Sequence, residues 1–387
     1  MKQPLTIGLD AKRIVANGTG LGSFGRTLAN DLAAIEGLSL RLYAPDGGRD
    51  ELRRQVPERA NLCFCQPPAP RFALTAGIEK ALWRSRGITR QLQADGVQVF
   101  HGLSGELPSG LRRAGIRSVV TIHDLIFMRH PEYYHWPDTK IYEWKFRRAL
   151  READRIVAIS ECTRRDICQL GGIDPASVHL IYQSCAPRFK AAASAQEMAE
   201  ATGRYRLPDH YVLSVGSIEE RKNALLAVKA LQWLPEDIHL VLVGRRTAYT
   251  EKVAAYAEKH QTGHRLHLLH GVPDADLPAL YARAEVFVYP SRYEGFGIPI
   301  IEAVGMGLPV VGCTGSCLEE AGGPDNLYVD PDDAQAMAHA IGLLLPGAEG
   351  REERIGRSRR YIERFANSDA ARQYAELYYS LIEELKN

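Results

Sequence analysis

Two glutamates separated by seven residues carry the clearest chemical signal in this sequence. Glu294 and Glu302 flank a turn in which Gly295 and Gly297 let backbone NH groups approach a ligand closely. The turn follows a short apolar run, and Pro299 suits the first turn of a helix after it. Carboxylates placed in this way can accept hydrogen bonds from sugar or ribose hydroxyls. The alternative is a structural role, in which Glu294 favours the helix N-terminus and Glu302 pairs with an arginine.

A second group of residues predicts the binding of a diphosphate. Arg221 and Lys222 are adjacent cations that follow the apolar run 211–215 and Gly216 and precede a predicted helix. The arginine fork can bind two oxygens at once, and the lysine supplies a compact charge. As the bond of a nucleotide sugar breaks, negative charge grows on the leaving diphosphate, so fixed cations stabilise the transition state more than the ground state. A solvated surface pair is the alternative.

His123 and Asp124 follow another apolar run, 119–122, in the first half of the chain. A histidine at a strand end is a good partner for a hydroxyl and can act as a base. We expect His123 to face the cations of the second half across a cleft. Ser160 follows the run 155–159, and its hydroxyl is predicted to cap the next helix.

The glycines near the N-terminus allow two interpretations. Gly20, Gly22 and Gly25 match the dinucleotide fingerprint GxGxxG, and Asp46 follows the next predicted strand. The fingerprint should follow its strand directly, however, whereas nine residues, 11–19, intervene here. We therefore set aside an NAD(P)-binding dehydrogenase and expect a loop, 17–25, whose backbone contacts a diphosphate or an acceptor. A tight strand-to-helix connection is the alternative.

Short apolar runs alternate with helical patterns and predict an α/β fold with parallel sheets covered by helices on both faces. The first half has predicted strands at 5–10, 38–43, 97–101, 119–122, 155–160 and 178–182. The second half has predicted strands at 211–215, 238–243, 266–270, 286–290 and 309–311. A segment rich in Ala, Ser and Gln, about 187–208, is predicted to be a linker. In such sheets ligands bind beyond the carboxyl ends of the strands, so motif residues should lie just after strands.

Composition argues against several classes of protein. The 387 residues exceed what one hydrophobic core usually serves, and a net charge of +1 gives no reason to expect a nucleic acid partner. The seven cysteines include no CxxC pair, and Cys313 and Cys317 have no His or other Cys nearby in the sequence. We therefore expect no disulfide framework and no metal site, and a cytoplasmic setting. The apolar stretch at the N-terminus is too short for a signal peptide, and no run reaches the ~18 residues of a membrane span.

Taken together, these motifs resemble the retaining, GT-B-fold glycosyltransferases of family 4, also called glycosyltransferase group 1, including its mannosyltransferases. The resemblance covers nearly the whole chain. Its motifs are Gly20–Gly25, His123–Leu125, Ser160–Thr163, Gly216–Asn223 and the Glu-x7-Glu signature Glu294–Glu302. The resemblance implies two Rossmann-like domains that face each other across a cleft. Residues 1–190 would bind the acceptor and be joined by the C-terminal helix 370–387, and residues 205–369 would bind the nucleotide sugar.

The resemblance also assigns roles to residues. His123, Arg221, Lys222 and Glu294 would be catalytic, with His123 beside the C6 hydroxyl of the donor sugar. Arg221 and Lys222 would hold the diphosphate, Glu294 would contact the transferred sugar, and Glu302 would bind the ribose. The other donor-binding residues would be Gly20, Gly22, Gly216, Val272, Phe296, Gly297 and Ile298. No metal or cofactor is implied. Where the family often has an Asn-Gly turn this chain has Gln183-Ser184, which we expect to affect the interdomain connection rather than chemistry.

The donor and acceptor are expected by analogy with bacterial members of the family. The segment 123–134 is similar to members that use GDP-mannose, and the acceptor would be a glycan or lipid-linked saccharide in cell-surface polysaccharide synthesis. A UDP-hexose donor and a GT-B epimerase remain alternatives. The segment 71–93 is basic and carries Trp83, so it could form an amphipathic helix at the inner face of a membrane. An ordinary solvated helix is the alternative there.

Overall fold

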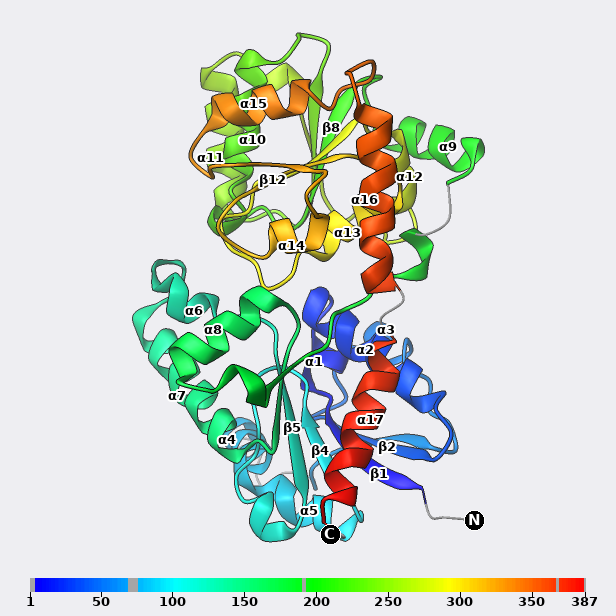
Figure 1. Ribbon diagram of the computed structural model, residues 1–387, viewed down its shortest axis with the longest axis vertical. Helices are drawn as coiled ribbons and strands as arrows, with labels where there is room; N and C mark the ends of the chain where they lie inside the picture. Colours follow the sequence, from blue (N-terminus) through cyan, green and yellow to red (C-terminus); the bar gives the residue numbers. More distant parts are fainter. Residues whose placement is uncertain (1–3, 69–75, 190–192, 367–368, 386–387) are drawn as a thin grey trace. The chain divides into compact units, whose positions relative to one another are not determined.

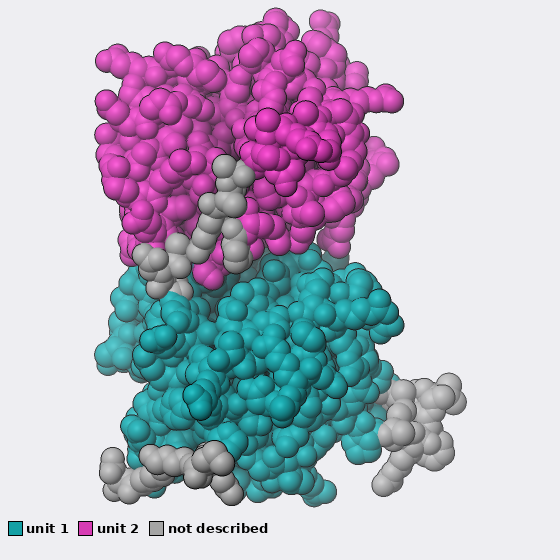
Figure 2. Space-filling model, turned by 90° about the vertical axis from the view of Figure 1, so that its right-hand side faces the viewer, with its two compact units in different colours: residues 1–183, 369–387 teal, residues 184–368 magenta. Residues whose placement is uncertain are grey.

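The computed structural model describes residues 4–68, 76–189, 193–366 and 369–385. The chain forms two compact units, of which one comprises Met1–Gln183 with Asp369–Asn387 and the other Ser184–Ser368 (Figures 1 and 2). Each unit is built around its own parallel sheet with helices packed against it. The α/β fold with parallel sheets, predicted from the alternation of apolar runs and helical patterns, is confirmed.

The first unit contains a seven-stranded sheet in the order β3-β2-β1-β4-β5-β6-β7, in which all the pairings are parallel. The strands are β1 (Leu5–Asp10), β2 (Leu38–Tyr43), β3 (Leu62–Cys65), β4 (Val99–Gly102), β5 (Arg117–Ile122), β6 (Arg155–Ala158) and β7 (Val178–Leu180). The chain proceeds from β1 outward to β3 and then returns to place β4 on the other side of β1. The strand order therefore reverses between β1 and β4, and such a switch point is where parallel sheets bind ligands.

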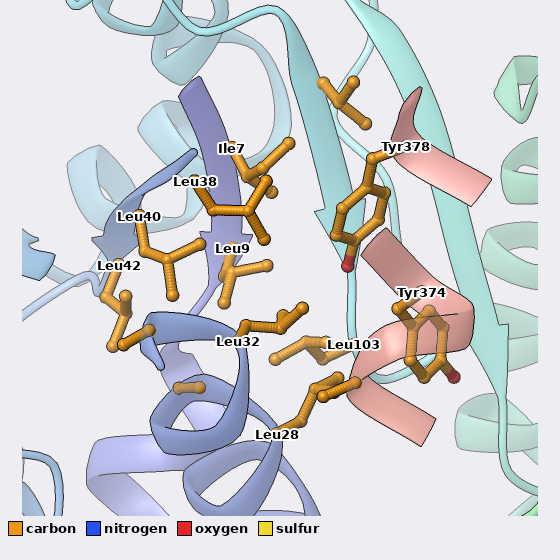
Figure 3. Close-up of a cluster of buried hydrophobic side chains, with 14 of the residues drawn as sticks. Ile7, Leu9, Leu28, Leu32, Leu38, Leu40, Leu42, Leu103, Tyr374 and Tyr378 are labelled. Atoms are coloured by element: carbon orange, nitrogen blue, oxygen red, sulfur yellow. The ribbon is translucent and has the colours of Figure 1, made fainter. Parts of the chain in front are cut away.

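Helices cover both faces of this sheet. They are α1 (Lys12–Ala16), α2 (Gly20–Ala33), α3 (Asp50–Arg53), α4 (Ala76–Leu82), α5 (Ile88–Ala94), α6 (Ile126–Arg129), α7 (Trp136–Glu152), α8 (Glu161–Gly171) and α17 (Ala370–Glu383). One core cluster joins β1 and β2 to α2 and α17, and it includes Ile7, Leu32 and Tyr378 (Figure 3). A second cluster includes side chains of α5, α7 and α8. Both faces of the central strands are thus buried, as is usual in a parallel sheet covered by helices.

The C-terminal helix α17 is part of the first unit. The hydroxyl of Tyr378 lies 2.6 Å from Nδ1 of His101 on β4, and Nε2 of His101 lies 2.8 Å from the hydroxyl of Thr121 on β5. That hydroxyl in turn lies 2.8 Å from the hydroxyl of Tyr374. Burial lowers the pKa of His101 to about 3, so its ring is neutral and can serve as both donor and acceptor in this chain of hydrogen bonds.

The second unit has a six-stranded parallel sheet in the order β10-β9-β8-β11-β12-β13. Its strands are β8 (Tyr211–Val215), β9 (His239–Val243), β10 (Leu266–Leu269), β11 (Val286–Tyr289), β12 (Val310–Cys313) and β13 (Leu327–Val329). Its helices are α9 (Ala195–Tyr205), α10 (Ala224–Ala230), α11 (Ala248–Lys259), α12 (Leu277–Arg283), α13 (Ile298–Gly305), α14 (Leu318–Gly322), α15 (Ala334–Gly342) and α16 (Arg351–Ala366). Here the strand order reverses between β8 and β11.

Besides the strands β3 and β13, which were not predicted, two segments differ from the sequence prediction. The first is 17–25, predicted as a glycine loop, whereas α2 already begins at Gly20. The second is the predicted linker, about 187–208, which contains α9 and packs against α12. A capping box formed by Ser194 and Glu197 starts α9, and this pairing satisfies the NH groups of the first turn. The predicted cap of α8 is confirmed, because Oγ of Ser160 accepts a hydrogen bond from the backbone NH of Thr163.

The predicted basic amphipathic segment, 71–93, lies partly outside the described residues, since the description resumes at residue 76. A π-helical turn, Trp83–Gly87, connects α4 to α5. Trp83 is buried, and Arg84 forms ion pairs with Asp10 and Glu106, so these two side chains of the expected amphipathic face point into the protein. In the described parts of the chain, no helix is both long enough and apolar enough to cross a bilayer.

Candidate functional site

The switch point of the second unit brings two predicted motifs to one edge of the sheet. The segment after β8 contains Gly216, Arg221 and Lys222, and the segment after the adjacent strand β11 contains Glu294. Because β8 and β11 are hydrogen-bonded neighbours, their carboxyl ends lie side by side. The two motifs, which are more than sixty residues apart in the sequence, are therefore in direct contact.

Glu294 is the centre of this cluster. Its Oε1 atom lies 2.7 Å from Nζ of Lys222, 2.9 Å from Nη1 of Arg221, 2.7 Å from the hydroxyl of Ser291 and 3.2 Å from that of Tyr289. All four contacts converge on a single carboxylate oxygen. Among the described residues, Oε2 has no hydrogen-bond partner. One oxygen of Glu294 thus fixes the side chain, while the other remains available for a hydroxyl of a ligand.

The charges in this cluster stabilise one another. Burial alone would raise the pKa of Glu294, but attraction to Lys222 and Arg221 outweighs burial and lowers the pKa to about 2. Burial alone would lower the pKa of Lys222, but the carboxylate of Glu294 raises it above its usual value. Both groups are therefore charged across the physiological pH range.

Lys222 is held in place by its neighbours. Its ammonium has three N–H donors, of which one is directed to Glu294 and another to the hydroxyl of Tyr289, at 2.6 Å. A Cβ atom on Gly216 would lie 3.3 Å from Cδ of Lys222, so the glycine leaves room for the lysine stem. Asn223 adopts a left-handed conformation at φ 53° and donates a hydrogen bond from its side chain to the carbonyl of Pro331. These contacts orient the ammonium toward the cluster.

Arg221 forms the outer part of the cluster. Its Nη1 donates to the carbonyl of Tyr293 at 2.6 Å, and its Nη2 pairs with Glu219 at 2.9 Å. The backbone carbonyl of Arg221 accepts a hydrogen bond from the NH of Arg292, which ties the segment after β8 to the segment after β11. The predicted pair of cations is thus a fixed part of the fold rather than a solvated surface pair.

The other end of the Glu-x7-Glu signature lies on α13. Gly297 precedes this helix at φ 106°, and a Cβ atom there would lie 3.3 Å from side-chain carbons of both Leu318 and Ala321. Glycine is therefore required at this turn, and the helix begins at Ile298 as predicted. The side chain of Phe296 is buried with its ring edge-on to Phe365, so only its backbone is placed to contact a ligand.

Glu302 lies one turn into α13. Its Oε2 accepts a hydrogen bond from the buried hydroxyl of Tyr281 at 3.1 Å. Burial raises the pKa of Glu302 to about 7, against the lowering effects of that hydrogen bond and of Arg188. The two carboxylates of the signature therefore differ, since one is firmly ionised and the other titrates near neutral pH. Val272, another expected donor-binding residue, follows β10 and is half-buried.

In the first unit, His123 follows β5 as predicted, but it is committed to structural hydrogen bonds. Its Nε2 donates to the carbonyl of Leu103 at 2.8 Å, and its Nδ1 lies 3.0 Å from the side-chain amide nitrogen of Gln183. Burial lowers its pKa to about 4, so the ring is neutral at physiological pH. The residue pair Gln183-Ser184, expected to affect only the interdomain connection, therefore has a member that contacts a predicted site residue.

A pocket of about 230 Å³ surrounds His123 at the switch point of the first unit. Residues after β1, β4 and β5 contribute Arg13, Gly105, Glu106 and Asp124 to its lining. Phe127, Tyr134, Tyr142, Lys145 and Phe146 are among the other lining residues. Glu106 pairs with Arg84 and with Lys145, which lies 3.2 Å away. This combination of aromatic rings and charged side chains is suited to a sugar, because rings stack on its CH face and charged groups bond its hydroxyls.

Gly20 and Gly22 lie at the start of α2, where the sequence predicted a loop. A Cβ atom on Gly22 would lie 1.8 Å from the backbone carbonyl oxygen of Asn17, so this glycine allows the preceding segment to pack against the helix. Arg26 donates hydrogen bonds to that same carbonyl and to the carbonyl of Ile14, both at 2.9 Å. Close packing thus accounts for Gly22, whereas Gly20 is exposed and a Cβ atom there would have open space around it.

Sequence reasoning missed several residues of these sites. Tyr289 and Ser291 flank the end of β11 and both bind Glu294, yet in the sequence they have the appearance of an ordinary strand end. The Arg84–Glu106 pair joins segments that no motif connects. The sequence signal that could have identified Tyr289 and Ser291 is their position at the end of a strand, just before a recognised motif. Among the described residues, no group of three or more His, Cys, Asp or Glu side chains is placed to hold a metal ion.

Comparisons with known proteins agree with this geometry. A profile described as "Glycosyltransferase Family 4" matches residues 18–184, and one described as "Glycosyl transferases group 1" matches residues 200–361. The O-antigen chain mannosyltransferase B of Escherichia coli is 31% identical over 285 residues, which cover 72% of this chain and 74% of that protein.

A further relative and a solved structure extend the comparison. The GDP-mannose-dependent alpha-(1-6)-phosphatidylinositol monomannoside mannosyltransferase of Mycolicibacterium smegmatis is 30% identical over 247 residues, which cover 60% of this chain and 62% of that protein. The structure of a sucrose-phosphate synthase from Thermosynechococcus elongatus superposes with a TM-score of 0.80 at 22% identity, covering 98% of this chain and 100% of that one. This structural similarity indicates a common fold.

Proposed function

The chain belongs to the retaining, GT-B-fold glycosyltransferases of family 4, and we propose that it transfers a hexose from a nucleoside diphosphate donor to an acceptor hydroxyl. The observation that carries this proposal is the cluster in which Lys222 and Arg221 surround one oxygen of Glu294. A donor of this kind presents a diphosphate and a sugar next to each other. The cluster offers two cations for the former and a free carboxylate oxygen for the latter.

The charges of the cluster suit departure of the diphosphate. Lys222 and Arg221 would bind the phosphate oxygens, and their attraction would increase as negative charge develops there in the transition state. Oε2 of Glu294 would accept hydrogen bonds from hydroxyls of the transferred sugar. With a pKa of about 2, Glu294 is a weak base and a poor nucleophile, which argues against a covalent intermediate on this residue.

The hydrogen bonds and the charge of His123 determine whether it can accept the proton of the acceptor hydroxyl. Because Nε2 donates to Leu103 and the ring is neutral, His123 would have to release Gln183 before Nδ1 could act as a base. We therefore assign His123 to positioning beside the donor sugar. The departing phosphate would take the proton of the acceptor hydroxyl, which is the front-face route that family resemblance implies. No metal ion is required in this scheme, because the two cations carry the charge of the diphosphate.

The two ends of the donor would be held by different elements. Glu302 on α13 would bind the ribose, and the backbone of Phe296, Gly297 and Ile298 would contact sugar and phosphate. Val272 after β10 would contact the base. The second unit, 205–369 in the sequence prediction, is on this account the donor domain. The first unit would bind the acceptor in the pocket beside His123, where aromatic rings and the carboxylate of Glu106 are available to a saccharide.

Mannose from GDP-mannose is the donor we propose. The relative in E. coli is named as an O-antigen chain mannosyltransferase, and the mycobacterial relative as GDP-mannose-dependent. The same E. coli name supports an acceptor that is a glycan or a lipid-linked saccharide of a cell-surface polysaccharide. A cytoplasmic location, where nucleotide sugars are made, stays a prediction.

A panel of nucleotide sugars tests the donor and the reaction together. The protein would be incubated with GDP-mannose, UDP-glucose and UDP-galactose, each with lipid-linked and free oligosaccharide acceptors, while GDP, UDP and glycosylated product are measured. We expect GDP release and mannosylated product from GDP-mannose alone. Equal turnover of a UDP-hexose would replace the proposed donor but keep the reaction. Interconversion of UDP-sugars without transfer, or NAD(P) reduction without release of a nucleoside diphosphate, would refute the proposed function.

A further inference from the structure

The helix α7 belongs to the first unit (Figure 1) and exposes an unusual set of side chains to solvent. Trp136, Trp144 and Ile141 are 73%, 56% and 49% exposed. Scattered apolar side chains are common on protein surfaces, but two exposed tryptophans and an isoleucine on one helix form a patch that calls for a partner. The buried side chains of α7 are Thr139, Phe146 and Ala149.

Helix geometry places these three apolar residues on one side of α7, together with four cations. With 3.6 residues per turn, Trp136, Lys140, Ile141, Trp144, Arg147, Arg148 and Arg151 fall within an arc of about 140°. The centre of this arc is opposite the buried residues. We name these seven residues the outer face of α7. The face contains four cations and three large apolar side chains, and no acidic residue lies within it.

Two acidic residues border the outer face. Glu143 lies beyond Trp136 on the helical projection and forms exposed ion pairs with Lys140 at 3.3 Å and with Arg147 at 3.0 Å. Glu152 lies near the opposite edge of the arc. Exposed pairs of this kind are weak and easily exchanged for other partners. The four cations therefore outnumber the two bordering acids, and the surface is net positive.

Arg148 links the outer face to the preceding segment. Its guanidinium lies 5.2 Å from the ring centre of Trp144 and donates hydrogen bonds to the carbonyls of Leu107 and Ser85. Arg148 thus packs against the ring of Trp144 and holds it in its exposed position. Ser85 belongs to the turn that follows α4, where Ile78 and Leu82 are also exposed. Apolar side chains therefore lie on two neighbouring helices of the same unit.

We propose that the outer face of α7 docks on an anionic lipid bilayer. Tryptophan prefers the boundary between lipid headgroups and acyl chains, because its ring is apolar while its N–H bonds to water. Lysine and arginine side chains extend their charges toward anionic headgroups while their stems lie against apolar surface. A helix that carries both kinds of side chain on one face lies in the plane of the membrane surface. The charge of the face complements acidic lipids.

Docking would bring the acceptor pocket close to the membrane, and this consequence rests on the proposed function. Tyr142, Lys145 and Phe146 of the same helix line the pocket beside His123. One helix thickness, about 10–12 Å, therefore separates the pocket from the docked surface. A saccharide attached to a membrane lipid could reach the pocket at this distance from the bilayer. A free oligosaccharide could reach the pocket without any membrane-docking surface. Vesicle binding itself involves neither donor nor acceptor, so it can fail or succeed independently of transfer.

Vesicle flotation with the full-length protein tests the proposal. The protein would be mixed with phosphatidylcholine vesicles that contain phosphatidylglycerol, and with vesicles of phosphatidylcholine alone. We expect flotation with the anionic vesicles at low salt and a large decrease at high salt, because salt screens the attraction between cations and headgroups. No flotation with anionic vesicles at low salt would overturn the proposal.

Paired variants locate the surface. Trp136→Ala with Trp144→Ala should weaken binding at least about tenfold, because both rings lose their burial in the interface. Trp233→Ala is the matched control, since Trp233 is an exposed tryptophan of the second unit and should leave binding unchanged. Lys140→Gln with Arg151→Gln should weaken binding by roughly 25-fold, at about fivefold for each cation. Lys252→Gln with Lys259→Gln on α11 is the matched charge control.

Two further measurements keep the outcome decisive. Circular dichroism melting of each variant checks that the fold is retained, and quenching of tryptophan fluorescence by brominated lipid should disappear in the Trp136 and Trp144 double variant. Equal losses in target and control variants would overturn the proposal. A wild-type dimer that becomes a monomer in the double tryptophan variant would also overturn it, because the face would then bind a second copy of the chain.

Discussion

Glu302 is the residue whose chemistry depends most on pH within the physiological range. Its carboxyl is enclosed by the second unit, and burial raises its pKa to about 7. Glu294 in the same signature has a pKa near 2, because Lys222 and Arg221 outweigh the effect of burial. The two glutamates therefore respond differently to pH although they belong to one motif. Only Glu302 can change its charge within the physiological pH range.

We predict that the KM for the donor depends on pH through Glu302. An ionised carboxylate accepts hydrogen bonds from ribose hydroxyls more strongly than a neutral carboxyl does, so the KM should rise as pH falls below about 7, by up to about tenfold per pH unit. Steady-state kinetics across this range measure the effect, and Glu302→Gln should remove it. A wild-type KM that is constant through neutral pH would contradict this role.

The same pKa predicts an effect on stability with a definite sign. The folded pKa of Glu302 lies above its usual value of 4.5, so its contribution to stability is complete below pH 4.5 and is lost as pH rises through about 7. Glu302→Gln should therefore raise the melting temperature at alkaline pH, and the gain should shrink as the pH is lowered. Thermal melts of both proteins over a pH series provide the measurement.

His123 offers a prediction that needs no activity assay. Its ring is neutral because burial lowers its pKa to about 4, and Gln183 donates to Nδ1. Replacing this donor by a carboxylate, Gln183→Glu, should raise the pKa of His123, because the new charge stabilises the imidazolium ring. Titration of the histidine ring signals by NMR measures both proteins. A wild-type His123 that titrates near 6.5 would show that the ring is less buried than the structure implies.

At the scale of elements, two glycines of α2 differ in how closely the surrounding residues pack against them. Gly22 leaves no room for a Cβ atom because the carbonyl oxygen of Asn17 would lie 1.8 Å from it, whereas Gly20 has open space. Gly22→Ala should therefore lower the free energy of unfolding by at least about 2 kcal/mol, because α2 must move away from the segment before it. Gly20→Ala should change it by less than about 0.5 kcal/mol. Urea denaturation measures both, and equal effects would contradict this packing.

Individual elements show which parts of the fold could be predicted. The strands β1, β2 and β8 match the predicted ranges because their apolar residues recur at least at every second position, which is a clear strand signal. The edge strand β3 was missed although its sequence, Leu-Cys-Phe-Cys, is apolar, because a run of four residues is too short to identify a strand. The helix α9 was taken for a linker because its composition is small and polar, although its capping box was visible in the sequence.

The site could be predicted only in part, and the reason is geometric. Motif spacing identified Lys222 and Glu294, and the structure places them in direct contact. It could not identify Tyr289 and Ser291, because their importance arises from the convergence of four donors on one oxygen. The glycines at the start of α2 were predicted to lie in a loop because their spacing matches a binding motif, whereas the helix already begins at Gly20 and Gly22 packs closely against Asn17. Their role in donor binding stays a prediction.

At the scale of the whole molecule, the last helix of the chain completes the first unit. Tyr374 and Tyr378 of α17 are buried in its core (Figure 3), and they connect to Thr121 and His101 by hydrogen bonds. A chain that ends after residue 368 should therefore have a first unit that melts well below that of the intact protein. Its buried apolar cluster would be opened, and His101 would lose a partner.

Differential scanning calorimetry measures this effect, and a chain that ends after Glu384 is the control because it retains α17. An unchanged first transition in the shorter chain would show that α17 contributes little to the unit. A milder variant, Tyr378→Phe, should cost about 1 kcal/mol because it removes a single buried hydrogen bond.

The claim on which the whole account depends is that the charge of Lys222 stabilises the leaving diphosphate. Lys222→Gln keeps a hydrogen-bond donor near Glu294 but removes the charge, and Lys252→Gln, exposed on α11, is the matched control. The most direct measurement is kcat/KM for the transfer reaction, with circular dichroism to verify folding. We predict a decrease of at least about 100-fold for Lys222→Gln and less than about twofold for Lys252→Gln. A folded Lys222→Gln protein with wild-type kcat/KM would contradict the account.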